Sequence, residues 1–328
     1  MQQRLEYIDI AKAIAIVSVV AGHVLLYDLY GGEHIGKSSL MKILGSYHNF
    51  LFMFLSGMVS VTVIEKAEIL KDMYKRFRCL IVPAVVVGIP YAYCTGANAI
   101  MFFQNSWKWG YWYLFVLFAL YMVSYPLALV QDKYMKYVYL IIAPVWLFIY
   151  RHTYPIPQVI NDTLDIDFIV RFFPYFFIGS IVKRHKLHSK LFTLPTLGIC
   201  LIITVMQNFI YDIAGRYLID YIVTFAEIIL IVSICRLGGG KITKKIRDWL
   251  TFIGRNTLYI YIFHYIALQF MSMPSLHEWF SQNGNICIDL LAVIVPTIIA
   301  IAFSLSIKQF MEKSPMIMKI VFNKNIER

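Results

Sequence analysis

The chain has 328 residues, of which 59% are hydrophobic and only 15% are charged. Soluble proteins carry about 25% charged residues, so this composition excludes an ordinary soluble protein and indicates a polytopic membrane protein. The formal net charge of +11 does not indicate nucleic-acid binding, because the basic residues lie in short clusters between apolar runs. The expected partner of these runs is a lipid bilayer.

Ten segments are apolar and long enough to be candidates for membrane-spanning helices, which need about 20 residues each. No soluble domain is left over, so we expect an all-α fold: one transmembrane domain over residues 1–328, built as a bundle of about ten helices. The expected spans are 8–29, 48–64, 79–95, 111–130, 137–150, 168–182, 191–210, 218–235, 252–272 and 286–307.

Most of the 30 Lys and Arg residues fall on one side of the membrane if the first span begins in the cytoplasm. Cytoplasmic loops of membrane proteins carry such an excess of basic residues. We therefore predict that both termini are cytoplasmic and that the chain is a multi-pass protein of the cytoplasmic (inner) cell membrane.

The first span carries three titratable residues, Asp9, Lys12 and His23. Each residue of an α-helix turns by about 100° and rises by about 1.5 Å, so all three share one face, with His23 about 16 Å beyond Lys12. A polar stripe is costly in lipid unless it faces protein or water. One interpretation is an interfacial Asp9–Lys12 pair with His23 as a satisfied interior histidine; the other makes His23 a proton-transfer group.

Further polar residues lie in other spans. His48 begins the second span, and Ser56 and Gly57 follow it, where small residues also favour close helix packing. His264 in the ninth span has a depth similar to that of His23, so the two histidines are predicted to face one cavity. Glu227 in the eighth span has no role that the sequence assigns.

Three more positions are candidates for binding. Lys75, Arg76 and Arg78 lie at the cytoplasmic mouth of the third span, where they serve topology and could also hold phosphates. Trp112 begins the fourth span at the outer interface, where an aromatic belt is the ordinary explanation. Arg171 in the sixth span either pairs with Asp167 or binds an anionic or hydroxylated acceptor.

The five cysteines show no C-x-x-C spacing and are odd in number, so we predict neither a disulfide framework nor a metal site.

Seven segments together resemble the transmembrane acyltransferase 3 family of bacterial O-acyltransferases, in particular its fucose 4-O-acetylase-like branch. They occur in the family's order and cover nearly the whole chain. The segments are "IDIAKAIAIVSVVAGH", "HNFLFMFLSG", "KRFRCLIVP", "YWYLFVLFALY", "FFPYFFIGSIV", "IGRNTLYIYIFHY" and "FMEKSP".

The resemblance implies transfer of an acyl group, usually acetyl, from cytoplasmic acyl-CoA to a hydroxyl of a cell-surface or lipid-linked carbohydrate. Lys12 and His23 match the spacing of the family's basic residue and essential histidine, although many members have Arg at the first position. A lysine offers a point charge in place of a planar fork. By resemblance, Arg76 and Arg78 would lie near the acyl-CoA, and Glu312 matches the acidic residue that commonly ends the last helix.

We therefore expect an O-acetyltransferase whose catalytic residues are His23, Lys12, Asp9 and His264, with Lys75, Arg76 and Arg78 on the donor and His48, Trp112 and Arg171 on the acceptor. His23 would act as general base or briefly carry the acyl group. By resemblance, acyl-CoA, usually acetyl-CoA, would be a co-substrate, and no cofactor is expected. The alternative is a transporter or flippase of a lipid-linked sugar, although internal repeats and paired broken helices, typical of transporters, are not evident.

Overall fold

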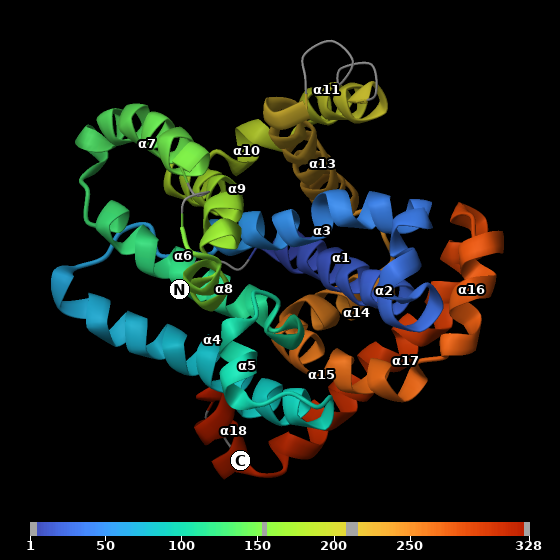
Figure 1. The fold of residues 1–328 in the computed structure, drawn as a ribbon. Helices are drawn as coiled ribbons and strands as arrows, with labels where there is room; N and C mark the ends of the chain where they lie inside the picture. The colour runs from blue at the N-terminus through green and yellow to red at the C-terminus, as the bar shows by residue number, and fades with distance from the viewer. Residues whose placement is uncertain (1–4, 153–155, 208–215, 325–328) are drawn as a thin grey trace. The chain divides into compact units, whose positions relative to one another are not determined.

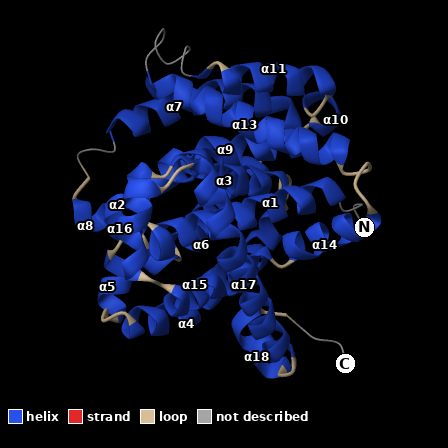
Figure 2. Ribbon diagram, turned by 90° about the vertical axis from the view of Figure 1, so that its right-hand side faces the viewer, coloured by secondary structure: helices blue, strands red, loops and turns tan. Residues whose placement is uncertain are grey.

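The computed structural model describes residues 5–152, 156–207 and 216–324. Every regular element within these ranges is a helix, as Figures 1 and 2 show, and this confirms the predicted all-α class. The helices pack into two compact units. The first unit comprises Met1–Leu55 and His185–Ser306, and the second comprises Ser56–Arg184 and Ile307–Arg328.

The first unit is built around helix α1. The helices that belong to it, wholly or in large part, are α1 (Glu6–His23), the π-helix η1 (Val24–Leu29), α2 (Gly31–His34), η2 (Ile35–Lys37), α3 (Ser39–Met58), α10 (His188–Leu191), α11 (Leu194–Val205), α13 (Arg216–Gly238), α14 (Lys244–Arg255), α15 (Thr257–Met271), α16 (Pro274–Asn283) and α17 (Ile286–Glu312).

The second unit takes its helices from the middle of the sequence and from the C-terminal end. These helices are α4 (Lys66–Cys94), α5 (Ala99–Gln104), η3 (Lys108–Gly110), α6 (Trp112–Ala128), α7 (Asp132–His152), α8 (Gln158–Leu164), α9 (Ile166–Arg184) and α18 (Pro315–Phe322). Among them, α4 packs on α6 and α18, and α9 packs on α6 and α7.

Helix α1 is the best-buried of the long apolar helices, and it packs against α13, α14 and α15. Its sequence explains this position, because Ala11, Ala13, Ala15 and Ala21 have almost no exposed surface. Small side chains let neighbouring backbones approach closely, which is the main means of helix association where lipid removes the hydrophobic advantage. The polar face of α1 is thereby placed against protein.

Gly254 of α14 lies directly against the backbone of α1. A Cβ at this position would overlap the carbonyl oxygen of Asp9, whereas a Cβ at Gly198 of α11 would meet nothing within 4 Å. We expect Gly254→Ala to lower the free energy of unfolding by about 1–3 kcal/mol through overpacking. Gly198→Ala should leave it unchanged or raise it by up to about 1 kcal/mol, because alanine favours helix. Thermal unfolding of both variants in one detergent tests this, and equal midpoints would contradict the close contact.

Four of the described helices are long and apolar enough to cross a membrane: Glu6–Leu29, Lys66–Cys94, Ile219–Gly238 and Ile286–Glu312. Shorter apolar helices are Trp112–Ala128, Leu194–Val205 and Thr257–Met271. These seven segments overlap seven of the ten expected spans. The count of ten and the cytoplasmic position of the termini stay predictions, and residues 208–210 of the seventh expected span lie outside the described ranges.

The ninth expected span, 252–272, is not one continuous helix. The chain breaks at Asn256, which separates α14 from α15. Helix α14 carries exposed Ile246, Trp249 and Phe252 beside several basic residues, while α15 is apolar and largely buried. The hydropathy of residues 252–255 therefore belongs to an amphipathic helix rather than to the start of a span.

The expectation of close helix packing at Ser56 and Gly57 is confirmed within the second unit. A Cβ at Gly57 would overlap the carbonyl oxygen of Phe176 in α9. The hydroxyl of Ser56 lies 3.2 Å from that of Tyr113 in α6. Both residues thus serve close packing inside the second unit.

Candidate functional site

His23, at the C-terminal end of α1, lies against two side chains of α15. Its Nδ1 is 2.8 Å from Nε2 of His264, and its Nε2 is 3.2 Å from the hydroxyl of Tyr265. The two imidazole rings are nearly parallel, with an interplanar angle of 11°. His264 is fully buried, and His23 keeps some exposed surface. The matching depths inferred from the sequence are therefore realised as a direct contact between the two histidines.

The hydrogen bonds around this pair determine which nitrogen carries each proton, in the neutral state of both rings. His264 Nδ1 is 3.0 Å from the carbonyl oxygen of Ile260, which can only accept, so the proton of His264 is on Nδ1. Its Nε2 is then an acceptor, and His23 Nδ1 must donate to it. The lone pair of His23 is consequently on Nε2, where the Tyr265 hydroxyl donates to it.

Such an arrangement is suited to general base catalysis. One ring is held in a single tautomer by a second ring, and the basic nitrogen points to a hydroxyl. Sequence reasoning did not single out Tyr265, although it directly follows His264 in "IFHY". Whether His264 and Tyr265 both reach the imidazole of His23 depends on how α15 is rotated against α1, which the sequence does not specify.

His48 of α3 is buried, and its Nδ1 bonds to the carbonyl oxygen of Leu44 in its own helix. The ring of His48 is thus oriented by the backbone of its own helix, and the acceptor-binding role stays a prediction.

Asp9 and Lys12 lie on α1, at the other end of the helix from His23. Asp9 is 2% exposed and its Oδ2 is 3.3 Å from Nε of Arg255, at the end of α14. Lys12 is half-buried and also has an interaction partner. Arg255 is thus a partner of Asp9 that the sequence did not reveal, because it lies 246 residues away along the chain.

The basic cluster of the second unit is divided among different partners. Arg76 Nε donates to Asp72 at 2.7 Å, and its guanidinium lies 3.6 Å from the ring centroid of Tyr121. Arg78 donates to the carbonyl oxygens of Lys319 and Ile320 near the end of α18. Lys75 is exposed. The guanidinium of Arg78 thereby satisfies carbonyl groups that the helix end leaves without intrahelical partners.

Trp112 and Arg171 differ in their surroundings. Trp112 is 5% exposed and packs on Phe168 and Phe172, with centroid distances of 4.6 and 5.4 Å. It belongs to the aromatic interior of the second unit rather than to an exposed belt. Arg171 is exposed, and the carboxylate of Asp167 accepts a hydrogen bond from Asn161.

A buried ion pair outside the expected spans joins Lys108 to Asp165. The Lys108 ammonium is 2.5 Å from the carboxylate and donates to the carbonyl oxygen of Asp162 at 3.1 Å. Both side chains are at most 2% exposed. Burial raises the pKa of Asp165 to about 6, against the opposing effect of Lys108, and burial lowers the pKa of Lys108. Sequence analysis did not reveal this pair, because its two residues lie 57 positions apart.

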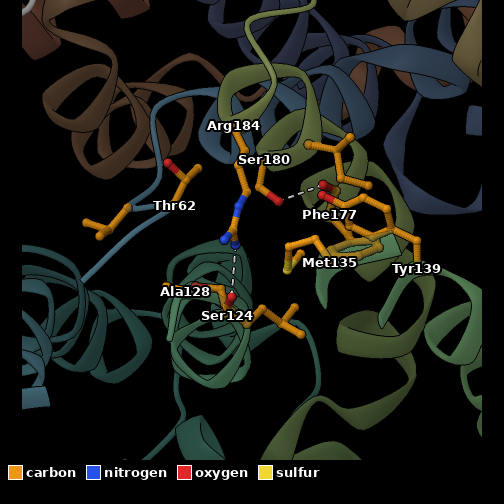
Figure 3. Close-up of a pocket in the computed structure, with 11 residues that line it drawn as sticks. Thr62, Ser124, Ala128, Met135, Tyr139, Phe177, Ser180 and Arg184 are labelled. Carbon is orange, nitrogen blue, oxygen red and sulfur yellow. Dashed lines mark hydrogen bonds between the residues drawn. The ribbon is translucent and has the colours of Figure 1, made fainter. Parts of the chain in front are cut away.

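A small pocket lies in the second unit, between α6, α7 and α9 (Figure 3). Arg184 extends into it, and its guanidinium donates to the carbonyl oxygens of Leu127 and Val130 and to Asp132. Because these groups already bind the Arg184 guanidinium, its positive charge is not available to an anion in the pocket. The rest of the lining is a mixture of polar and apolar side chains. The residues that line it include Thr62, Ser124, Met135, Tyr139, Phe177 and Ser180.

Glu227 of α13 is buried, and its Oε2 has no hydrogen-bond partner among the described residues. Over the same part of the chain, no cluster of three or more His, Cys, Asp or Glu side chains is arranged to hold a metal ion.

Residues 5–305 match the model of the family described as an acyltransferase domain. No curated protein and no solved structure matches the chain.

Proposed function

Since the chain belongs to the acyltransferase 3 family and its apolar helices make it a multi-pass membrane protein, we propose that it is an O-acetyltransferase of the cytoplasmic membrane. The donor is acetyl-CoA, supplied from the cytoplasm, and the acceptor is a hydroxyl of a cell-surface or lipid-linked carbohydrate. The family match and the set of apolar helices support this proposal.

The observation that carries the proposal is the orientation of His23 by His264. His23 Nε2 removes the proton of the acceptor hydroxyl as its oxygen attacks the thioester carbon. The carbon–sulfur bond then breaks, the electron pair leaves with the CoA sulfur, and the imidazolium returns its proton to that thiolate. In the resting structure the Tyr265 hydroxyl, at 3.2 Å, occupies the place on Nε2 that the acceptor hydroxyl takes.

His264 is a positioning residue in this scheme. Its Nε2 accepts a hydrogen bond from the N–H of His23 Nδ1. An imidazolium formed at His23 therefore remains hydrogen-bonded on both nitrogens. A base held in one tautomer by a second group is the arrangement that makes a histidine effective in acyl transfer. Asp9 and Lys12 contribute through the contact of α1 with α14, where Arg255 pairs with Asp9.

The donor contacts that we propose involve the basic cluster of α4. Lys75 is exposed and offers a mobile ammonium for a phosphate, while Arg76 is held in a defined orientation by Asp72 and Tyr121. Arg78 supports this surface through the backbone of α18. On the acceptor side we propose His48, which is buried, and Arg171, which is exposed.

Incubation of the purified protein with acetyl-labelled acetyl-CoA and a mixture of glycans tests the proposal. We expect the label to be transferred to a glycan and to be released by mild alkali, as an oxygen ester is. Protein in vesicles that moves a lipid-linked sugar across the membrane, without transferring label, would instead favour a flippase. The family match favours the enzyme.

A further inference from the structure

The chain directly after His23 does not continue as an α-helix. Residues Val24–Leu29 form a π-helix, and the amide of Tyr30 bonds to the carbonyl oxygen of Leu25 at 2.9 Å, five residues back. Such turns are rare and occur frequently at functional sites. In this chain the π-turn lies immediately beside the proposed base, so its side chains border the reacting centre.

Tyr27, in the middle of the π-turn, is the exposed neighbour of His23. Its ring centroid lies 5.9 Å from that of His23 and 6.2 Å from that of Tyr265. Tyr27 is 43% exposed, whereas His264 and Tyr265, the other rings against His23, are 0% and 2% exposed. A ligand that reaches His23 from the surface therefore passes the ring of Tyr27.

Asp28, the next residue, is 3% exposed, and neither of its carboxylate oxygens has a hydrogen-bond partner among the described residues. Burial of an unpaired carboxylate is costly, so such a group is neutral or receives a partner from a ligand. A neutral carboxyl group both donates and accepts, as do the hydroxyls of a sugar. The packing of the first unit therefore does not explain why a carboxyl group is buried at position 28.

The π-turn is held at several points by the rest of the first unit. The carbonyl oxygen of Tyr27 accepts hydrogen bonds from Ser272 and from His277 at 3.4 and 3.2 Å. Tyr30, which directly follows the turn, donates to the buried carboxylate of Asp289 at 2.7 Å, and Ser38 donates to its other oxygen. The turn is thus positioned in advance, as a binding element must be to give specificity.

From these observations we infer that the π-turn is the acceptor subsite, in which Tyr27 carries the apolar face of a pyranose ring and Asp28 binds one of its hydroxyls. This inference rests on the proposed function, because it names the carbohydrate-binding residues of the same site. Aromatic rings with a few placed polar groups are typical of pockets that orient a ligand. Both residues are positioning residues, and the proton transfer stays with His23.

The experiment measures equilibrium binding of a radiolabelled methyl pyranoside to the full chain in nanodiscs, and in parallel acetyl transfer to the same glycoside, to glycerol and to water. Tyr27→Ala should raise KM for the glycoside roughly tenfold, while Tyr27→Phe keeps it, because the ring provides the contact. Asp28→Leu should raise the same KM about three- to tenfold, and Asp28→Asn less, because an amide still donates and accepts. Transfer to the glycoside should fall relative to transfer to glycerol and water in Tyr27→Ala and Asp28→Leu.

The outcomes separate the subsite from the reaction. Unchanged glycoside KM and binding in Tyr27→Ala and Asp28→Leu would overturn the subsite, and so would an equal loss of transfer to glycerol and water, which indicates a structural defect. If the native protein binds the glycoside through Tyr27 but transfers no acetyl group, the acyltransferase reaction fails while the subsite stands. If the native protein binds no pyranoside at all, the subsite is wrong.

Discussion

Replacement of His23 by alanine is expected to lower the rate of acetyl transfer by about 10²- to 10⁴-fold, which is the usual contribution of a general base. The side chain lies at the end of α1 and its imidazole contacts His264 and Tyr265, so its loss removes the basic nitrogen together with these two contacts, while the apolar packing of α1 remains. The measurement is the initial rate of label transfer by purified protein, normalised to the amount of folded protein.

Two further variants show whether the loss is chemical. His152→Ala is a matched control, because His152 is exposed and bonds to the carbonyl oxygen of Phe148 in its own helix, so its rate should not change. His264→Leu removes the acceptor that holds the His23 tautomer, and we expect a loss smaller than that of His23→Ala. Full activity in a folded His23→Ala protein would contradict the role of His23 as the base.

Replacement of Lys108 by methionine is expected to lower the free energy of unfolding by about 3–5 kcal/mol, the cost of leaving a buried charge without its partner. Asp165 would keep a carboxylate that is 2% exposed and has lost its ammonium. The double variant Lys108→Met/Asp165→Asn should recover most of the stability, because an amide carries no charge. Asparagine also tolerates the positive φ of 55° at position 165.

The deficit of Lys108→Met should depend on pH. Burial holds the pKa of Asp165 near 6, above its ordinary value, and loss of Lys108 raises this pKa further. A carboxyl group whose pKa is raised by folding favours the folded state at low pH and loses that contribution as pH rises through the folded pKa. The deficit relative to the native protein should therefore be small at pH 5 and large at pH 8. Unfolding midpoints at the two pH values measure it, and a deficit independent of pH would argue against the ion pair.

The sequence was sufficient to predict the class of the protein and to single out the histidine that we propose as its base. Apolar runs and sparse charge predict membrane helices because both are properties of consecutive residues. The regular turn of α1 placed Lys12 and His23 on one face, since eleven residues complete just over three turns. The break at Asn256 was missed, because hydropathy does not distinguish the apolar side of the amphipathic helix α14 from a span.

The partners of these residues were decided by the tertiary structure. His23 meets His264 across 241 residues of sequence, and Lys108 meets Asp165 across 57. Such contacts depend on how helices rotate and pack against one another, which local periodicity does not specify. The same reason applies to the π-turn, because its i,i+5 geometry depends on anchors at Ser272, His277 and Asp289 that lie far along the chain. The sequence by itself determined that a titratable residue faces the protein interior, and only the packing of α15 on α1 decided which nitrogen of His23 carries the lone pair.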